Sequence, residues 1–118
     1  MGRRVSEALG RGRTVVNRGE VWWVEDPDAG RRPHLVLTRQ AAIPVLNAYL
    51  AVPATRTIRG IPTEVRLAVE DGMPTECALS LDNVAVVPRG FFVERVTKLR
   101  TDRLAEVCAA LAVASGCA

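Results

Sequence analysis

The chain has 118 residues, of which 48% are hydrophobic and 25% are charged. This length suits one globular domain with a modest core and leaves no room for a second independent domain. No apolar run approaches the roughly 20 residues of a membrane span. The basic first 13 residues lack the apolar stretch of a signal peptide. We therefore expect a cytoplasmic protein with no membrane contact.

The formal net charge of +3 is concentrated at the start of the chain. Four arginines against Glu7 within residues 1–17 account for all of it, so the remaining body is formally neutral. Residues 1–16 are also rich in glycine and poor in apolar groups, which predicts a disordered basic tail before a folded domain over residues 17–118. Any binding of a polyanion by the domain must then come from local placement of arginines.

The basic residues are arginines except for Lys98. The planar guanidinium fork pairs with phosphate in a bidentate manner, so this bias suits phosphate recognition. A GC-rich genome produces the same bias without functional meaning, and composition does not separate the two explanations.

The three cysteines, Cys77, Cys108 and Cys117, are an odd number without C-x-x-C spacing. This pattern favours neither a disulfide framework nor a zinc knuckle. No cluster of histidines, cysteines or paired carboxylates has metal-ligand spacing, so we expect no metal and no cofactor.

The first half of the domain is predicted to consist of strands and turns. Residues 18–25 contain the β-rich run VWWV, a turn follows at residues 26–30, and residues 34–38 form a second strand, which together predict a hairpin. Residues 40–46 contain a proline and predict a short helical turn or loop. Residues 48–54 predict another strand.

The second half continues with short strands and then changes period. Residues 63–69 alternate apolar and polar side chains, and further strands are predicted at residues 76–81, 83–87 and 91–97. Leu104, Val107, Cys108 and Leu111 then fall on one helical face, with Thr101 as the expected N-cap and Gly116 as the stop. We predict a mainly β, α+β fold in which the antiparallel strands close into a small barrel before a C-terminal helix.

Two segments in order carry a family resemblance. Residues 18–24, RGEVWWV, and residues 30–37, GRRPHLVL, resemble the opening strands of the MazF/PemK (Kid) toxins, which read R-G-E/D-I/V-W and then G-x-R-P followed by apolar residues. Residues 52–55, VPAT, are similar to the family's V-P-x-T/S, and Leu81-Asp82-Asn83 is similar to its acidic-amide pair. The resemblance spans residues 18 to 113. The turn between the first two strands is shorter than is common in the family.

The resemblance implies an SH3-like barrel of the CcdB/PemK type and a homodimer. It also implies a metal-independent endoribonuclease, an mRNA interferase that cleaves single-stranded RNA, whether messenger, ribosomal or transfer RNA, and that a cognate antitoxin inhibits. The expected products carry 2′,3′-cyclic phosphate and 5′-hydroxyl ends.

The resemblance also assigns roles to single residues. Arg32 matches the catalytic arginine that stabilises the phosphorane, Thr55 matches the hydroxyl that hydrogen-bonds the scissile phosphate, and Asp82 lies where some members carry an acidic residue that acts on the substrate. Arg31 and Arg56 flank the two main motifs and are candidate phosphate contacts. Ser80 and Asn83 are further candidate RNA-binding positions, with Ser80 standing where one branch of the family has a second arginine.

Simpler explanations remain for several of these residues. An isolated arginine is commonly a surface ion-pair partner, and an isolated threonine is commonly an ordinary strand or turn residue. His34, the sole histidine, is a structural or exposed residue or else a general base. Trp22 and Trp23 point to opposite faces of one strand, which predicts that one lies in the core and the other lines a dimer or RNA surface.

Two other functions fit the same fold. One is a CcdB-like toxin that poisons DNA gyrase, which would not need Arg32 or Thr55. The other is a non-catalytic SH3-like binding module.

Overall fold

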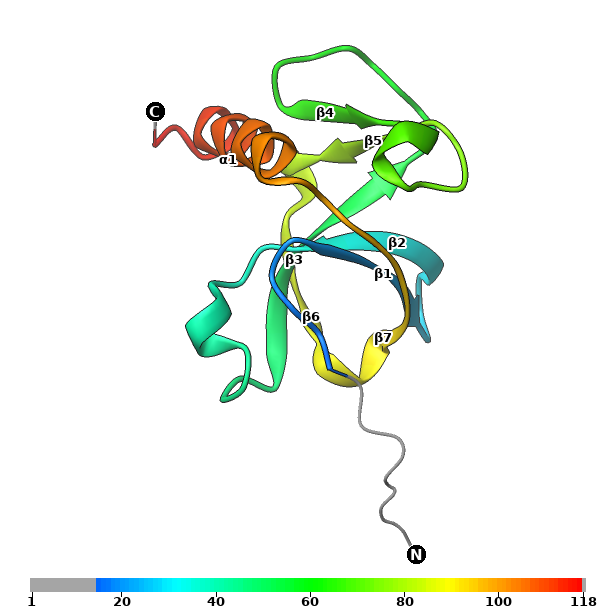
Figure 1. Cartoon of the computed structure of the whole chain (residues 1–118), viewed down its shortest axis with the longest axis vertical. Coiled ribbons are helices and arrows are strands. Elements are labelled where there is room, and N and C mark those ends of the chain that lie inside the picture. The colour runs from blue at the N-terminus through cyan, green and yellow to red at the C-terminus, as the bar shows by residue number, and fades with distance from the viewer. Residues whose placement is uncertain (1–14, 118) are drawn as a thin grey trace, which may run out of the picture.

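The computed structural model describes residues 15–117. In this part of the chain, antiparallel strands are followed by one C-terminal α-helix, as Figure 1 shows. The strands are β1 (Glu20–Asp26), β2 (Gly30–Val36), β3 (Ala48–Thr55), β4 (Glu64–Leu67), β5 (Cys77–Ser80), β6 (Ala85–Pro88) and β7 (Phe92–Lys98), and the helix is α1 (Thr101–Ser115). Short 3₁₀ turns are η1 (Gln40–Ala42), η2 (Val69–Asp71), η3 (Leu81–Asn83) and η4 (Arg89–Phe91). The predicted mainly β fold with a C-terminal helix is confirmed.

Strand β2 begins at Gly30, four residues before the predicted start. Gly30 has φ +89°, and Asp26 Oδ1 accepts hydrogen bonds from the backbone N–H groups of Asp28 (2.8 Å) and Ala29 (3.3 Å), so the turn is tight. Pro33 is tolerated because β3 pairs with β2 only from His34 onward. The two arginines before Pro33 therefore lie on a strand and not in a loop.

Strand β3 pairs with three other strands. Its first half pairs with β6, its middle pairs with β2, and its end pairs with β5 at Thr55↔Ala78. The turn η3 separates β5 from β6 in the chain, so these two strands meet opposite ends of β3. This pairing joins the β4–β5 part of the sheet to the part formed by β1, β2 and β7.

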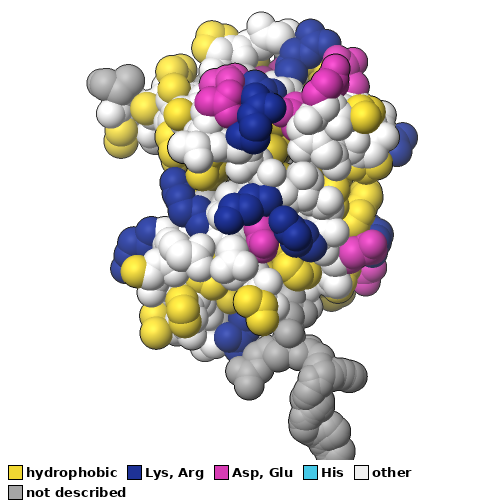
Figure 2. Space-filling model, in the orientation of Figure 1, with side chains coloured by type: hydrophobic (Ala, Val, Ile, Leu, Met, Phe, Trp, Pro, Cys, Tyr) yellow, Lys and Arg dark blue, Asp and Glu magenta, His cyan; other side chains and the backbone are white. Residues whose placement is uncertain are grey.

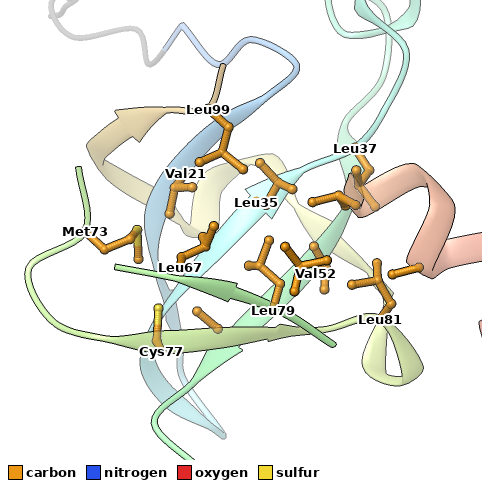
Figure 3. Packing of buried hydrophobic residues seen from close by; sticks show 14 residues of the cluster. Val21, Leu35, Leu37, Val52, Leu67, Met73, Cys77, Leu79, Leu81 and Leu99 are labelled. Carbon is orange, nitrogen blue, oxygen red and sulfur yellow. The ribbon is translucent and has the colours of Figure 1, made fainter. Parts of the chain in front are cut away.

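The buried side chains form two clusters. The first includes Leu35, Val52 and Leu79, which are fully buried and gather between the strands in Figure 3. The second includes Tyr49 and Phe92, whose ring centroids are 5.5 Å apart. Because successive residues of a strand point to opposite faces, β2 and β3 contribute to both clusters.

The folded part includes Val16. This residue is only 2% exposed and packs in the second cluster. Val16 thus packs with the domain although it belongs to the predicted tail, and the boundary at residue 17 stays a prediction. Residues 1–14 of the predicted tail lie outside the described residues.

Helix α1 buries a slightly different face from the predicted one. Val107 and Ala110 are buried and Leu104 and Leu111 are partly buried, whereas Cys108 is exposed. Of the four residues predicted to share one helical face, Cys108 is therefore the one that stays exposed, and Ala110 packs with Val107 in the first cluster instead. No helix of residues 15–117 is long and apolar enough to cross a membrane.

The ends of α1 agree in part with the sequence. Thr101 is the first helical residue, and the N-cap is Arg100, which makes no side-chain capping hydrogen bond. Thr101 was therefore misplaced by one residue as the N-cap. Gly116 ends the helix with φ +73°, as predicted.

The segment after η2 is fixed against β7. The hydroxyl of Thr97 donates a hydrogen bond to the Asp71 carbonyl (3.1 Å), and Arg103 of α1 donates through Nε to Asp71 Oδ1 (3.0 Å). Gly72 has φ +93°, and a Cβ built on it would lie 2.2 Å from Thr97 Oγ1. These contacts determine where the chain enters the segment from Met73 to Cys77.

We expect Gly72→Ala to destabilise the protein more than Gly60→Ala. Both glycines have positive φ, so both alanines carry the left-handed penalty of about 1–2 kcal/mol. Only the alanine at residue 72 also collides with Thr97, because nothing lies within 4 Å of a Cβ at Gly60. Urea unfolding of both variants measures the difference, and equal losses would contradict the close approach at Gly72.

Candidate functional site

A cavity of about 600 Å³ opens beside the β1–β2 hairpin. Its wall is formed by the hairpin, by the end of β3 and by the segment that leads into β5. The polar and aromatic side chains that line it are Trp23, Arg31, Arg32, Thr55, Arg56 and Thr57. Four of the seven residues predicted for the site therefore line one cavity.

Arg32 of β2 and Thr55 of β3 line the same cavity. The pairing of the two strands ends at His34 and Pro53, and each of the two residues lies two positions beyond that pair. Residues two apart on a strand share a face, so both side chains lie on one face of the two strands. Arg32 is exposed and Thr55 is half-buried. A ligand at the mouth of the cavity can contact both.

The arginines of the cavity differ in their partners. Arg31 forms ion pairs with Glu25 (2.5 Å) and Glu94 (3.1 Å), and its guanidinium carbon lies 4.7 Å from the centroid of the Trp23 ring. Within residues 15–117, neither Arg32 nor Arg56 has an ion-pair partner. The uncompensated positive charge at the cavity is therefore that of Arg32 and Arg56.

The Thr55 hydroxyl is oriented by a hydrogen bond within the turn that follows β3. Thr55 Oγ1 accepts a hydrogen bond from the backbone N–H of Thr57 at 3.1 Å. A hydroxyl has one hydrogen to donate as well as its acceptor lone pairs, so the Thr55 hydrogen remains available for an anionic oxygen. Guanidinium and hydroxyl donors on adjacent strands suit a phosphate group.

Asp82, Asn83 and Ser80 lie apart from this cavity. Asp82 Oδ2 accepts a hydrogen bond from the Thr63 hydroxyl (2.6 Å), and Asn83 Nδ2 donates one to the buried Ser80 Oγ (2.8 Å). Cys77 lines the cavity, and Ser80 follows three residues later on β5, about 10 Å away at the usual rise of a strand. The structure therefore does not bring these three residues together with Arg32 and Thr55.

The two tryptophans separate as the alternation predicts. Trp22 is buried, at 8% exposed, and its Nε1–H donates a hydrogen bond to the buried Glu20 (2.9 Å). Trp23 is half-buried and lines the cavity beneath Arg31. One tryptophan is thus part of the core, and the other offers an aromatic surface to a ligand.

His34 lies one pleat from Arg32 on β2. It is half-buried, and its Nδ1 is 3.1 Å from the carbonyl oxygen of Arg32. Burial lowers the pKa of His34 below its ordinary value, and the nearby Arg32 charge lowers it further, while the hydrogen bond to the Arg32 backbone opposes the shift. His34 is therefore neutral at pH 7.

One wall of the cavity was not predicted. Met73, Pro74 and Thr75 come from the segment between η2 and β5, about 20 residues after Thr55 in the chain. No motif or periodicity marks these residues. The β3–β5 pairing brings them to the site, because it places the start of β5 beside the end of β3.

Charge on the rest of the described surface is mixed. Figure 2 shows a group of basic side chains across the middle of one face, with acidic side chains above it and beside it. No three histidines, cysteines or carboxylates of residues 15–117 gather in a way that could hold a metal ion. All three cysteines are free thiols.

Fold and site together define a small antiparallel β-protein that offers arginine and hydroxyl donors to an anionic ligand. The family described as "PemK-like, MazF-like toxin of type II toxin-antitoxin system" matches residues 17–114. The chain belongs to this family.

Relatives and solved structures agree with this assignment. "Probable endoribonuclease MazF5" of Mycobacterium tuberculosis is 46% identical over 101 residues, covering 85% of this chain and 93% of the relative. "Probable endoribonuclease MazF2" of the same organism is 41% identical over 103 residues, covering 86% and 100%. A MazE–MazF crystal structure from Deinococcus radiodurans superposes with a TM-score of 0.75 at 30% identity, covering 88% and 98%. The expected barrel of the CcdB/PemK type is thus confirmed.

We expect the imidazole of His34 to titrate below pH 6.5, its ordinary value. Burial disfavours the charged ring, so the ring stays neutral until the solution is more acidic. Because the chain has one histidine, an NMR titration of protein without a histidine tag follows a single ring. A midpoint at or above 6.5 would contradict the burial of this side chain.

Proposed function

We propose that this chain is an endoribonuclease toxin that cuts single-stranded RNA without a metal ion. The observation that carries the proposal is the presence of Arg32 and Thr55 in the wall of one cavity, where Arg32 has no carboxylate partner among residues 15–117. The names of the relatives support the same activity.

The 2′-hydroxyl of the RNA is the nucleophile in this mechanism. Its oxygen attacks the adjacent phosphorus and loses its proton, while the bond from phosphorus to the 5′-oxygen breaks and that oxygen gains a proton. The products are a 2′,3′-cyclic phosphate and a 5′-hydroxyl. The Arg32 guanidinium stabilises the extra charge of the phosphorane, and the Thr55 hydroxyl donates to a non-bridging oxygen.

The neighbouring residues bind the flanking nucleotides. Arg56 is exposed and has no ion pair within residues 15–117, so it is suited to a second phosphate. Trp23 supplies a surface on which a base stacks, and Arg31, held by Glu25 and Glu94, covers that ring in the free protein. Asp82 has a structural role in this proposal, because its carboxylate bonds to Thr63 away from the cavity.

We further propose that the protein works in the cytoplasm and that an antitoxin neutralises it. A MazF of Deinococcus radiodurans that shares 30% of its residues with this chain was solved as a MazE–MazF complex. An antitoxin that covered the cavity would compete with RNA for Arg32 and Arg56.

A gyrase-poisoning toxin or a non-catalytic binding module on this fold would not depend on Arg32 and Thr55. Incubation of the purified protein with a long RNA, followed by a gel, separates these functions from the proposed one. Mapping of the cut ends on a mixed RNA pool then gives the cleavage sequence.

Cleavage should continue in excess EDTA and should fall about 10² to 10³-fold in Arg32→Ala, which is typical for loss of one preorganised donor. Arg32→Lys should recover little, because lysine keeps the charge but loses the planar fork. Single-turnover rates on a defined oligonucleotide measure both effects. Arg66→Ala is the matched control, since Arg66 is exposed, paired with Glu76 and outside the cavity.

Two results would contradict the mechanism. An RNA with a single 2′-deoxy nucleotide at the cut site should bind and remain intact, so cleavage of it at an unchanged rate excludes the 2′-hydroxyl as nucleophile. Full activity in Arg32→Ala would show that Arg32 is not a catalytic residue.

We also propose a homodimer. Leu50 and Val86 are directly opposite each other on β3 and β6, and both are exposed, at 36% and 68%, beside the exposed Leu46. An apolar patch of this kind is typical of an interface.

Light scattering coupled to size exclusion should therefore give twice the monomer mass at micromolar concentration. Leu50→Glu should shift the mass to that of a monomer, whereas Val113→Glu on the exposed side of α1 should not. A monomer mass for the unsubstituted protein would exclude the dimer.

A further inference from the structure

A second, smaller cavity adjoins Arg32 and has no role in the function proposed above. Its volume is about 280 Å³, and Arg32 lines both this cavity and the larger one. His34 and its partner Pro53 lie one pleat further along β2 and β3 and line the small cavity only. An RNA strand whose phosphate is bound at Arg32 therefore has a cavity on each side of that phosphate.

The walls of the small cavity are largely apolar. Val24 and Val87 belong to the second buried cluster, at 2% and 8% exposed, and Phe91 packs against it. Drug-sized ligands occupy pockets of roughly 300–1,000 Å³, so this cavity suits one flat ring system. Aromatic and apolar walls of this kind receive unstacked bases in single-stranded RNA recognition.

Apart from the guanidinium of Arg32, the polar side chains of the cavity, Asp26 and His34, offer hydrogen-bond acceptors. A carbonyl oxygen can only accept, so the Nδ1 of His34 that faces the Arg32 carbonyl carries the ring proton. The neutral ring then leaves Nε2 as an acceptor. Asp26 Oδ1 accepts two backbone N–H groups of its turn, and within residues 15–117 its Oδ2 has no hydrogen-bond partner.

We propose that the cavity formed by Asp26, His34 and Phe91 binds one nucleobase of the RNA beside the phosphate at Arg32, with a preference for guanine. The inference rests on the proposed function. Guanine places two donors, N1–H and the 2-amino group, side by side on its Watson–Crick edge, which matches a carboxylate and a neutral imidazole. Adenine and cytosine present one amino group there, and uracil presents one N–H.

The sole histidine makes binding directly observable. The full chain without a histidine tag is titrated with GMP, IMP, AMP, CMP, UMP and inorganic phosphate while the ring signals of His34 are followed by NMR. GMP should give a saturable shift, and its affinity should exceed that of IMP, which lacks the 2-amino group, by about tenfold. Equal affinities for all nucleotides, or the same shift with phosphate alone, would overturn the proposal.

Asp26→Asn is the discriminating variant. The amide oxygen of asparagine can still accept the hydrogen bonds of the Asp28 and Ala29 N–H groups, so the turn is preserved. The second carboxylate oxygen is replaced by an NH₂ group, which donates hydrogen bonds and does not accept them. GMP binding should weaken about tenfold and the advantage of GMP over IMP should disappear. Asp28→Asn is the matched control, because Asp28 is exposed in the same turn but does not line the cavity. Unchanged GMP binding in Asp26→Asn would overturn the assignment.

The cleavage assay distinguishes this inference from the function on which it rests. The inference is supported if the mapped cut sites have guanine beside them and if Asp26→Asn no longer prefers guanine at that position. RNA cleavage by a protein that binds no nucleotide at His34 overturns the inference and leaves the proposed function standing. Selective GMP binding without RNA cleavage overturns the proposed function and leaves the cavity as a nucleobase site.

Discussion

The register of β2 on β3 is the constraint on which the site depends. His34 pairs with Pro53 and Leu35 pairs with Val52, and the fully buried Leu35 and Val52 fix this alignment. A slip of one residue would move Leu35 and Val52 from the face of the first cluster to the face of the second and would move Arg32 to the opposite face of β2. The free energy of burying two aliphatic side chains thus also fixes the face of the strand on which Arg32 lies.

The site is cationic because of the way its arginines are paired with carboxylates, and not because of the overall charge of the protein. The domain without its N-terminal segment is formally neutral, so no global field attracts an anion. At the cavity, Glu25 and Glu94 neutralise Arg31, whereas Arg32 and Arg56 have no such partner within residues 15–117. The two adjacent arginines differ because β1 places Glu25 opposite Arg31 and Val24 opposite Arg32, so only Arg31 has a carboxylate beside it on the neighbouring strand.

The fold was largely predictable because its signals are local. Period-2 alternation and turn residues marked the strands, and the change to a helical period marked α1. The errors fell where tertiary contacts decide. Pro33 lies within β2 because its neighbour β3 joins one residue later, and the helix buries Ala110 and not Cys108 beside Val107.

The sequence by itself determined the strand-rich class, the family and the two motifs that contain Arg32 and Thr55, since each is written in consecutive residues. Only the tertiary structure decided which residues meet. It placed Arg32 of β2 and Thr55 of β3 in the wall of one cavity, brought Met73 and Thr75 to the same cavity, and left Asp82 beside Thr63. Pairing between strands that are distant in the chain is set by the packing of buried side chains, which no single segment encodes.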